Sequence, residues 1–167
     1  MDDVAAPLGV GLDLAERTAF ARFDDASIRR AASRWLRPHE RAWCATQPSF
    51  REAMVVALSC KEAVYKARGS SGAFHEVSLT MHQRGESGWA VVDGIQEGKV
   101  VAWWEVSPGS VLALAVAAPA GDGWRLLERI LRGLSQGPTR EWVNSDASVR
   151  HLMRPPAGQP RTQHAMP

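Results

Sequence analysis

The chain has 167 residues, of which 45% are hydrophobic and 23% charged, and its formal net charge is +2. These values are typical of a soluble globular protein with a core of its own, and the weak basic excess does not demand a nucleic-acid partner. No uncharged apolar run is long enough to span a bilayer, and the first residues lack the basic and apolar regions of a secretory signal. We therefore expect a cytoplasmic protein that binds neither a membrane nor nucleic acid.

The first predicted element is a strand over Leu8–Leu14, which reads L-G-V-G-L-D-L. Glycines inside a strand pattern mark places where another backbone can approach closely. Asp13 stands among apolar neighbours in this strand. It is either an ordinary strand-end acid that caps a turn or a metal ligand that faces a helix further along the chain.

Two helices are predicted next. Asp24 or Asp25 can cap the first, which runs to about Leu36, and Pro38 suits the first turn of the second. Five basic residues gather in this stretch: Arg29, Arg30, Arg34, Arg37 and Arg41. The cluster is either a solvated helix face or a landing surface for an acidic partner.

The longest predicted helix runs from Ser49 to Gly69. Ser49 and Glu52 have the spacing of a capping box, and glycine often ends a helix in the left-handed conformation. Because Met54–Leu58 is an unbroken apolar run, we expect the rest of the fold to surround this helix. The fold is therefore organised around it.

One face of this helix carries both an acid and a base. At about 100° per residue, a single stripe holds Val55, Ser59, Glu62 and Lys66. Taken alone, Glu62 and Lys66 have the spacing of an ordinary surface ion pair, worth a few tenths of a kcal/mol. A carboxylate on an apolar helix is costly unless a cation or hydrogen-bond donors satisfy it. Glu62 therefore gains interest when it is considered together with Asp13.

A turn, Gly69-Ser70-Ser71-Gly72, follows the long helix, and its backbone amides suit contact with a phosphate, although a plain linker has the same composition. Pro108 and Gly109 are placed as in a type II turn, which predicts a hairpin. Trp103 and Trp104 point to opposite faces of their strand, so at least one belongs to the core. The segments with strand character are Phe74–His82, Trp89–Asp93, Lys99–Val106 and Ser110–Ala118.

A last helix is predicted over Trp124–Leu134, and the chain beyond it becomes poor in aliphatic residues. We therefore expect an α+β domain over residues 1–134, in which the long central helix packs on an antiparallel sheet. Residues 135–167 are expected to form a disordered tail. Cys44 and Cys60 show no metal-ligand spacing and are expected to be small buried side chains.

The strand Gly9–Leu14 (G-V-G-L-D-L) and the helical segment Lys61–Lys66 (K-E-A-V-Y-K), about fifty residues apart, together resemble the signatures of the 4′-phosphopantetheinyl transferase superfamily. Those signatures are a G-[IV]-[GD]-[LIV]-D strand and a K-E-[AS]-x-x-K helix. The resemblance covers roughly Leu8 to Pro119. It includes features of the small holo-acyl-carrier-protein synthase type and of the C-terminal half of the surfactin-synthetase-activating type. It implies a single half-domain of this fold.

The resemblance implies Mg²⁺-dependent transfer of the phosphopantetheine arm of coenzyme A to a serine of an acyl or peptidyl carrier protein. Asp13 and Glu62 would be the metal ligands, because Mg²⁺ prefers carboxylate, phosphate and water oxygens. Glu62, or a water on the metal, would accept the serine proton, and Lys66 would stabilise or protonate the leaving adenosine 3′,5′-bisphosphate. Contacts with the coenzyme A phosphates would come from Lys61, Gly69 and Ser70. Acidic carrier domains would suit the arginine cluster.

The chain departs from the family pattern at two places. Ala15 stands where the larger type has a second acid. The small type also lacks an acid at this position. The family's V-S-[IL]-[ST]-H segment, which helps to hold coenzyme A, is not found, and Val106-Ser107-Pro108-Gly109 occupies the corresponding place. A homo-oligomer or a partner subunit is therefore expected to complete the pocket.

Two other functions remain open on the sequence. One is a non-catalytic relative that binds a carrier protein or coenzyme A without transfer. The other is a basic α+β module that binds nucleic acid, in which Asp13 and Glu62 are structural residues.

Overall fold

The computed structural model describes residues 9–69, 72–93, 100–118 and 122–136. Ser70 and residues 137–167 of the expected tail lie outside these residues, while residues 135 and 136 belong to the last helix. The described part contains five strands and four α-helices in an α+β arrangement. Their bounds are β1 Gly9–Glu16, α1 Asp25–Trp35, α2 Pro38–Ala45, α3 Phe50–Ala67, β2 Leu79–Arg84, β3 Ser87–Val92, β4 Val100–Val106, β5 Ser110–Ala117 and α4 Gly123–Gln136, with a short 3₁₀ turn at Phe74–Glu76.

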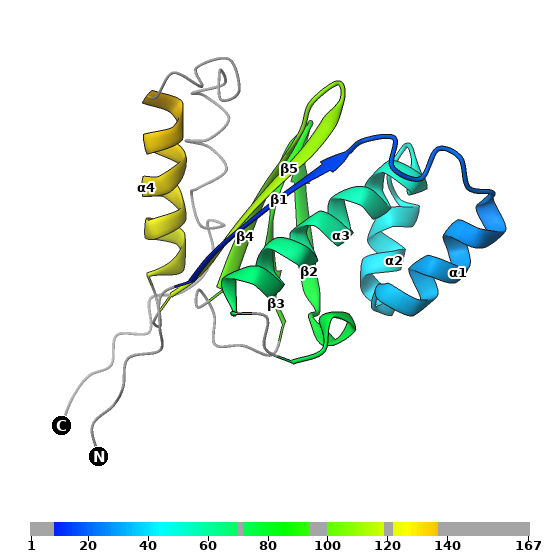
Figure 1. Ribbon diagram of the computed structural model, residues 1–167, viewed down its shortest axis with the longest axis horizontal. Helices are drawn as coiled ribbons and strands as arrows, with labels where there is room; N and C mark the ends of the chain where they lie inside the picture. The colour runs from blue at the N-terminus through cyan, green and yellow to red at the C-terminus, as the bar shows by residue number, and fades with distance from the viewer. Residues whose placement is uncertain (1–8, 70–71, 94–99, 119–121, 137–167) are drawn as a thin grey trace.

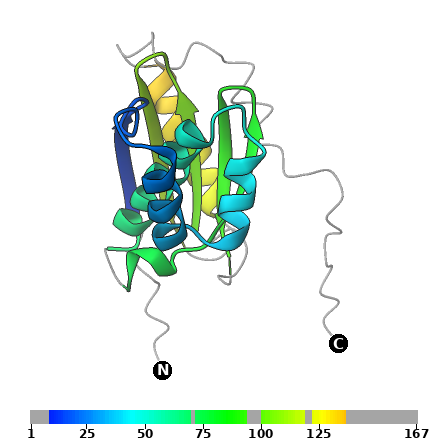
Figure 2. The same cartoon turned by 90° about the vertical axis from the view of Figure 1, so that its right-hand side faces the viewer.

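The five strands form one antiparallel sheet in the order β1-β5-β4-β3-β2. Helix α3 crosses one face of the sheet and α4 covers the other, while α1 and α2 lie beside α3 (Figures 1 and 2). Two hydrophobic cores flank the sheet, one between α3 and the sheet and one between the sheet and α4, and a third lies among α1, α2 and α3. The predicted α+β fold, with a long central helix on an antiparallel sheet, is confirmed.

Adjacent tryptophans on β4 divide between these two cores. Trp104 lies in the core under α3, and Trp103 lies in the core under α4. Both side chains are buried, as the alternation of a strand predicts for at least one of them. Cys44 and Cys60 are also fully buried, as expected. In the part of the chain described here, no helix combines the length and the hydropathy needed to cross a membrane.

The predicted ends of α3 are found, except that the carboxylate of Glu52, expected to complete a capping box, contacts Arg17 instead. Ser49 is the N-cap residue, and its hydroxyl accepts a hydrogen bond from the backbone N–H of Glu52. The carboxylate of Glu52 accepts a hydrogen bond from Nε of Arg17 at 2.9 Å, so it ties the helix start to the end of β1. Gly69 follows the helix with a φ of 70°, the left-handed conformation that glycine tolerates.

Two details of the sequence prediction are wrong. The expected strand Phe74–His82 begins only at Leu79, because Phe74 lies in the 3₁₀ turn and packs edge-on against Trp35 and Tyr65. The β4–β5 hairpin exists, but its turn is not type II. That turn requires a positive φ at Gly109, and Gly109 is not among the positive-φ glycines of the described chain.

Candidate functional site

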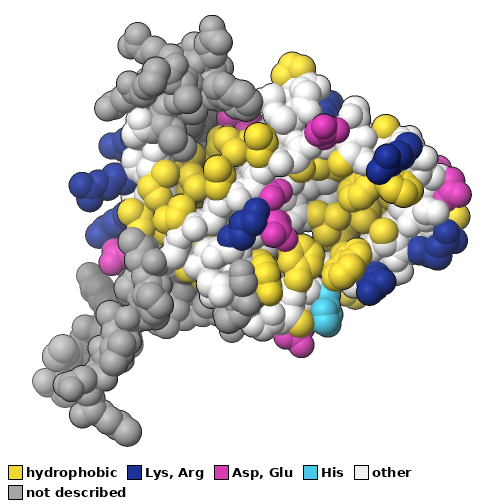
Figure 3. All heavy atoms as spheres, viewed as in Figure 1, with side chains coloured by type: hydrophobic (Ala, Val, Ile, Leu, Met, Phe, Trp, Pro, Cys, Tyr) yellow, Lys and Arg dark blue, Asp and Glu magenta, His cyan; other side chains and the backbone are white. Residues whose placement is uncertain are grey.

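The acids of the two sequence motifs meet around one lysine. Asp13 on β1 and Glu62 on α3 lie beside Lys66, whose Nζ is 3.0 Å from Oδ1 of Asp13 and 3.8 Å from Oε1 of Glu62. The same Nζ donates a hydrogen bond of 3.0 Å to the carbonyl oxygen of Leu12. Figure 3 shows acidic and basic side chains together on the face that α3 and β1 share. The sequence stripe and the strand acid therefore form one cluster.

Two glycines allow this meeting. Gly9, Gly11 and Asp13 alternate along β1 on the face toward α3. A Cβ atom at Gly9 would lie 1.8 Å from the carbonyl oxygen of Ala67, and one at Gly11 would lie 1.9 Å from that of Ala63. Only glycine permits this approach of helix to strand, so the expectation of close backbone packing at these glycines is confirmed.

A pocket of about 490 Å³ opens beside the cluster. Its walls come from β1, α1, α3, the segment after β1 and the 3₁₀ turn. Most of the lining side chains are apolar, and the acids are Asp13 and Glu62. The lining residues are Asp13, Ala15, Ala19, Phe20, Trp35, Val55, Leu58, Ser59, Glu62, Tyr65 and Phe74. Three members of the predicted stripe, Val55, Ser59 and Glu62, thus face the same space.

The chemistry of the cluster suits a hard cation. The atoms around Nζ of Lys66 are all oxygens, from Leu12, Asp13 and Glu62. The side chains of Asp13 and Glu62 are 19% and 41% exposed, so an ion from solvent can reach them. Among the described residues no group of three or more His, Cys, Asp or Glu gathers at metal-binding distance. A cation here would therefore need oxygens from a substrate or water in addition to these two carboxylates, which is the usual way Mg²⁺ is bound.

Lys61 lies elsewhere. Its side chain is fully buried, and its Nζ donates a 2.8 Å hydrogen bond to Oε2 of Glu40, which is also fully buried. Burial lowers the pKa of Lys61, although the Glu40 carboxylate opposes this. The expected contact between Lys61 and a coenzyme A phosphate has no support from this geometry, since its ammonium does not line the pocket.

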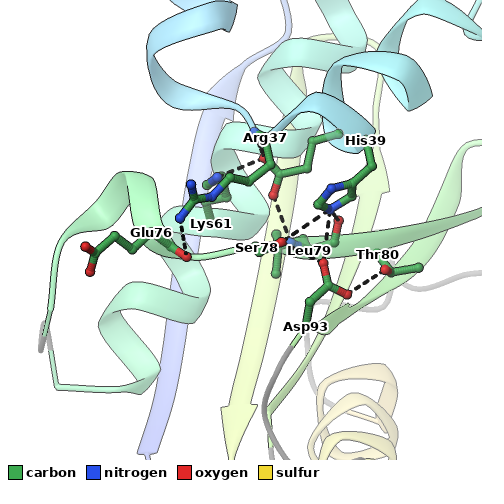
Figure 4. Close-up of polar contacts among 9 residues, drawn as sticks. Arg37, His39, Lys61, Glu76, Ser78, Leu79, Thr80 and Asp93 are labelled. Carbon is green, nitrogen blue, oxygen red and sulfur yellow. Dashed lines mark hydrogen bonds and ion pairs between the residues drawn. The ribbon is translucent and has the colours of Figure 1, made fainter.

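Glu40 holds three elements together, and the sequence did not single out this role. Besides Lys61 on α3, its carboxylate accepts hydrogen bonds from the backbone N–H groups of Arg37 at 2.7 Å and Leu79 at 2.8 Å. These contacts join the start of α2, the middle of α3 and the start of β2, and Figure 4 shows Arg37, Lys61 and Leu79 close together at this junction. A glutamate in the first turn after Pro38 was the available signal, but its partners Lys61 and Leu79 are 21 and 39 residues away in sequence.

Comparison with known proteins decides the family. A family model described as the 4′-phosphopantetheinyl transferase superfamily matches residues 9–115 of the chain. The chain belongs to this superfamily. A search of curated proteins found no match.

Two solved structures of holo-acyl-carrier-protein synthases are similar to this superfamily member. One, from Bacillus anthracis str. Ames in complex with CoA (3′,5′-ADP), is 19% identical and has a TM-score of 0.53, with 67% of this chain and 96% of that chain covered. The other, from Thermotoga maritima, is 20% identical with a TM-score of 0.48, covering 66% of this chain and 63% of that one. At this identity the first likeness establishes the fold.

In this phosphopantetheinyl transferase superfamily member the predicted arginine cluster divides in two. Arg29, Arg30 and Arg34 are exposed on α1, where Arg34 lies over the ring of Trp35 with 4.8 Å between its Cζ and the ring centroid. Arg37 and Arg41 are half-buried and donate hydrogen bonds to the backbone carbonyls of Glu76 and Leu36, respectively. The three arginines of α1 are therefore the ones available to a partner.

A second polar cluster was not anticipated from the sequence. Nε2 of His39 lies 3.0 Å from Oδ2 of Asp93, which also accepts a 2.7 Å hydrogen bond from Ser78, while Thr80 donates to Oδ1 (Figure 4). Partial burial would raise the pKa of Asp93, but the hydrogen bonds from Thr80 and Ser78 and the nearby His39 lower it further, so the net shift is downward. The cluster ties α2 to the neighbouring ends of β2 and β3.

Proposed function

We propose that this chain transfers the 4′-phosphopantetheine arm from coenzyme A to a serine of an acyl or peptidyl carrier protein. The observation that carries the proposal is the position of Asp13 and Glu62. They come from the two motifs of the superfamily, both contact the ammonium of Lys66, and line the same apolar pocket. A titratable pair at the edge of a large apolar pocket is the usual form of an enzyme site.

In the proposed reaction the carrier serine attacks the phosphorus that bears the pantetheine arm. The bond between that phosphorus and the oxygen of adenosine 3′,5′-bisphosphate breaks, and the bisphosphate leaves with the bonding electron pair. Glu62, half-exposed at the pocket edge, is placed to accept the serine proton. Lys66 supplies positive charge to the departing bisphosphate.

Asp13 and Glu62 fit a bound Mg²⁺, because the ammonium of Lys66 already sits among their oxygens and that of Leu12 as a cation would. When bound, Mg²⁺ would neutralise negative charge on the coenzyme A diphosphate. Gly69 and the backbone just after it remain candidates for phosphate contacts, because Gly69 follows the last turn of α3, in which Lys66 lies. Ser70 is proposed from the sequence alone, since it lies outside the described residues.

We also propose that the active form is an oligomer or has a partner subunit. Val10, Leu12 and Leu14 on β1 are 51%, 53% and 60% exposed, an unusual apolar row for a free surface. The chain lacks the family's V-S-[IL]-[ST]-H segment, and the corresponding residues close the β4–β5 turn. Light scattering on active protein tests this. A monomer with full activity contradicts it.

The carrier protein is proposed to dock on the exposed arginines of α1. Arg29, Arg30 and Arg34 present positive charge beside the pocket wall to which Trp35 belongs. Such surface charges mainly accelerate encounter with an acidic partner.

One observation favours a second candidate function. Because Pro108 and Gly109 form a tight turn where the family has its histidine segment, the chain would bind carrier protein or coenzyme A without transfer if no other group replaces that contact.

One assay separates the two functions. The protein is incubated with coenzyme A, Mg²⁺ and an apo-carrier protein, and the intact mass of the carrier is measured. Transfer predicts a gain of one phosphopantetheine group that is lost in Glu62→Gln. Glu128→Gln, on the opposite face of the sheet, is the matched control and should retain the gain. A carrier that binds but never gains mass, even with both proteins folded, overturns the transferase proposal.

A further inference from the structure

Lys66 occupies a place that a metal ion would also take. Its ammonium contacts both Asp13 and Glu62, at 3.0 Å and 3.8 Å. It also contacts the carbonyl oxygen of Leu12 at 3.0 Å. Three oxygens from two elements therefore converge on one positive charge.

This arrangement has an electrostatic reason. Two carboxylates at the edge of an apolar pocket repel one another and lose part of their hydration. A positive charge between them removes both costs. Lys66 lies one helical turn after Glu62 and reaches across to β1, so the chain supplies that charge by itself.

We propose that Lys66 is an internal counter-ion that a divalent cation displaces. In the metal-free protein Lys66 neutralises Asp13 and Glu62. When a divalent cation binds to the two carboxylates, the ammonium leaves Asp13 and becomes available to an anionic group of the substrate. The inference rests on the proposed function, because it takes Asp13 and Glu62 to be the metal ligands.

The exchange predicts that loss of Lys66 strengthens metal binding. The side chain is 42% exposed, so its pair with Asp13 is screened by solvent and worth little. A metal ion that no longer has to displace this pair should bind with a dissociation constant about two- to fivefold lower. If Lys66 instead had no contact with the metal ligands in the free protein, its removal would leave the affinity unchanged.

Calorimetric titration with Mg²⁺ alone, and with Mn²⁺ as a second probe, tests this on the full chain without substrate. Lys66→Met should bind about two to five times more tightly than the wild type. Arg129→Met removes one positive charge from the exposed side of α4, on the opposite face of the sheet, and should leave the affinity unchanged. If both variants bind the metal more tightly by the same factor, the effect is one of net charge alone, and the exchange is overturned. Equal or weaker binding by Lys66→Met would also overturn it.

Asp13→Asn distinguishes failure of the inference from failure of the metal assignment. If Asp13→Asn binds both ions as the wild type does, Asp13 is not a ligand and the metal part of the proposed function is wrong. If Asp13→Asn loses binding while Lys66→Met is unchanged, the ligands are right and only the exchange is wrong.

A spectroscopic measurement follows the ammonium directly. The sequence contains three lysines, Lys61, Lys66 and Lys99, so the ¹³Cε resonances of lysine-labelled protein are few and can be assigned with Lys66→Met. Saturating Mg²⁺ should shift the Lys66 resonance and leave that of Lys61, buried against Glu40, in place. A Lys66 resonance that stays in place while Mg²⁺ binds would overturn the exchange.

Discussion

Gly11→Ala is the sharpest test of how the site is assembled. A Cβ atom at this position would lie 1.9 Å from the carbonyl oxygen of Ala63 and 2.6 Å from the backbone nitrogen of Ala67. Ordinary van der Waals contact begins at 3.4 Å. Both obstructing atoms belong to the α3 backbone, so no side-chain rotation relieves the clash. The helix and the strand must separate by about 1.5 Å, the difference between 1.9 Å and 3.4 Å.

The cost of this separation can be bounded. Overpacking a well-packed core usually costs about 1–3 kcal/mol, and a clash between two backbones belongs at or above the upper end. Replacing glycine also stabilises by up to about 1 kcal/mol through the unfolded state, which offsets only part of it. For a chain of this size each kcal/mol lowers Tm by about 2–4 °C, so we expect a fall of roughly 5–10 °C.

The same movement should damage the site. Asp13 lies two residues after Gly11 and is 3.0 Å from Lys66 on the helix that must move. We therefore expect Gly11→Ala to weaken Mg²⁺ binding as well as lower Tm. Differential scanning calorimetry and Mg²⁺ titration measure the two effects. Gly109→Ala is the control, because a Cβ there meets no atom within 4 Å and its φ is not positive. If Gly11→Ala matches Gly109→Ala in both measurements, the close approach of α3 and β1 does not position Asp13.

Three further predictions concern other parts of the molecule. Glu40→Ala should destabilise by about 3–5 kcal/mol in urea unfolding, because it leaves Lys61 buried without its carboxylate. Glu40→Leu with Lys61→Met should recover only the part that the unpaired ammonium costs, since the backbone N–H groups of Arg37 and Leu79 still lose their acceptor; a double variant as unstable as Glu40→Ala contradicts this. Asp93→Asn should lower the free energy of unfolding by about 1 kcal/mol at pH 7. Only the ionised carboxylate of Asp93 accepts all its bonds, and its pKa is lowered from the ordinary value of an aspartate, so this difference should disappear as the pH falls through the lowered pKa; a constant difference throughout an acid titration refutes the assignment. The double variant Arg30→Glu, Arg34→Glu should raise KM for the carrier protein about tenfold at low salt and flatten the dependence of that KM on ionic strength. KM for coenzyme A should stay unchanged. A rise in KM for coenzyme A alone would mean that these arginines hold its phosphates.

The meeting of Asp13 with Glu62 and Lys66 could be predicted from the sequence because it depends on two local periods. In a strand, residues two apart share a face, so Asp13 faces the same way as Gly9 and Gly11. In a helix, residues four apart share a face, so Glu62 and Lys66 lie together. Once the glycines bring strand and helix into contact, the two faces must meet.

The position of Lys61 could not be predicted in the same way. Lys61 and Glu62 are neighbours in sequence and both are charged, yet one is fully buried and the other half-exposed. A rotation of about 100° separates them on the helix. The sequence does not say which of the two turns inward, because the partner of Lys61 is Glu40, twenty-one residues earlier. The cluster of His39, Ser78 and Asp93 escaped prediction for the same reason, since its members are 15 to 54 residues apart along the chain.

The strand β1 serves two surfaces at once. Its odd-numbered residues, among them Gly11 and Asp13, face α3, and its even-numbered residues Val10, Leu12 and Leu14 are exposed. β1 is an edge strand that pairs with β5, so this apolar row lies at the border of the sheet. An apolar edge of this kind favours association, and Asp13 is separated from it by the thickness of a single strand. A subunit that buries the apolar row would therefore also reach the border of the candidate metal site and would be placed to replace the histidine segment that the chain lacks. One partner can thus bury the exposed apolar residues on one face of β1 and also add ligand contacts near the other face, which carries Asp13.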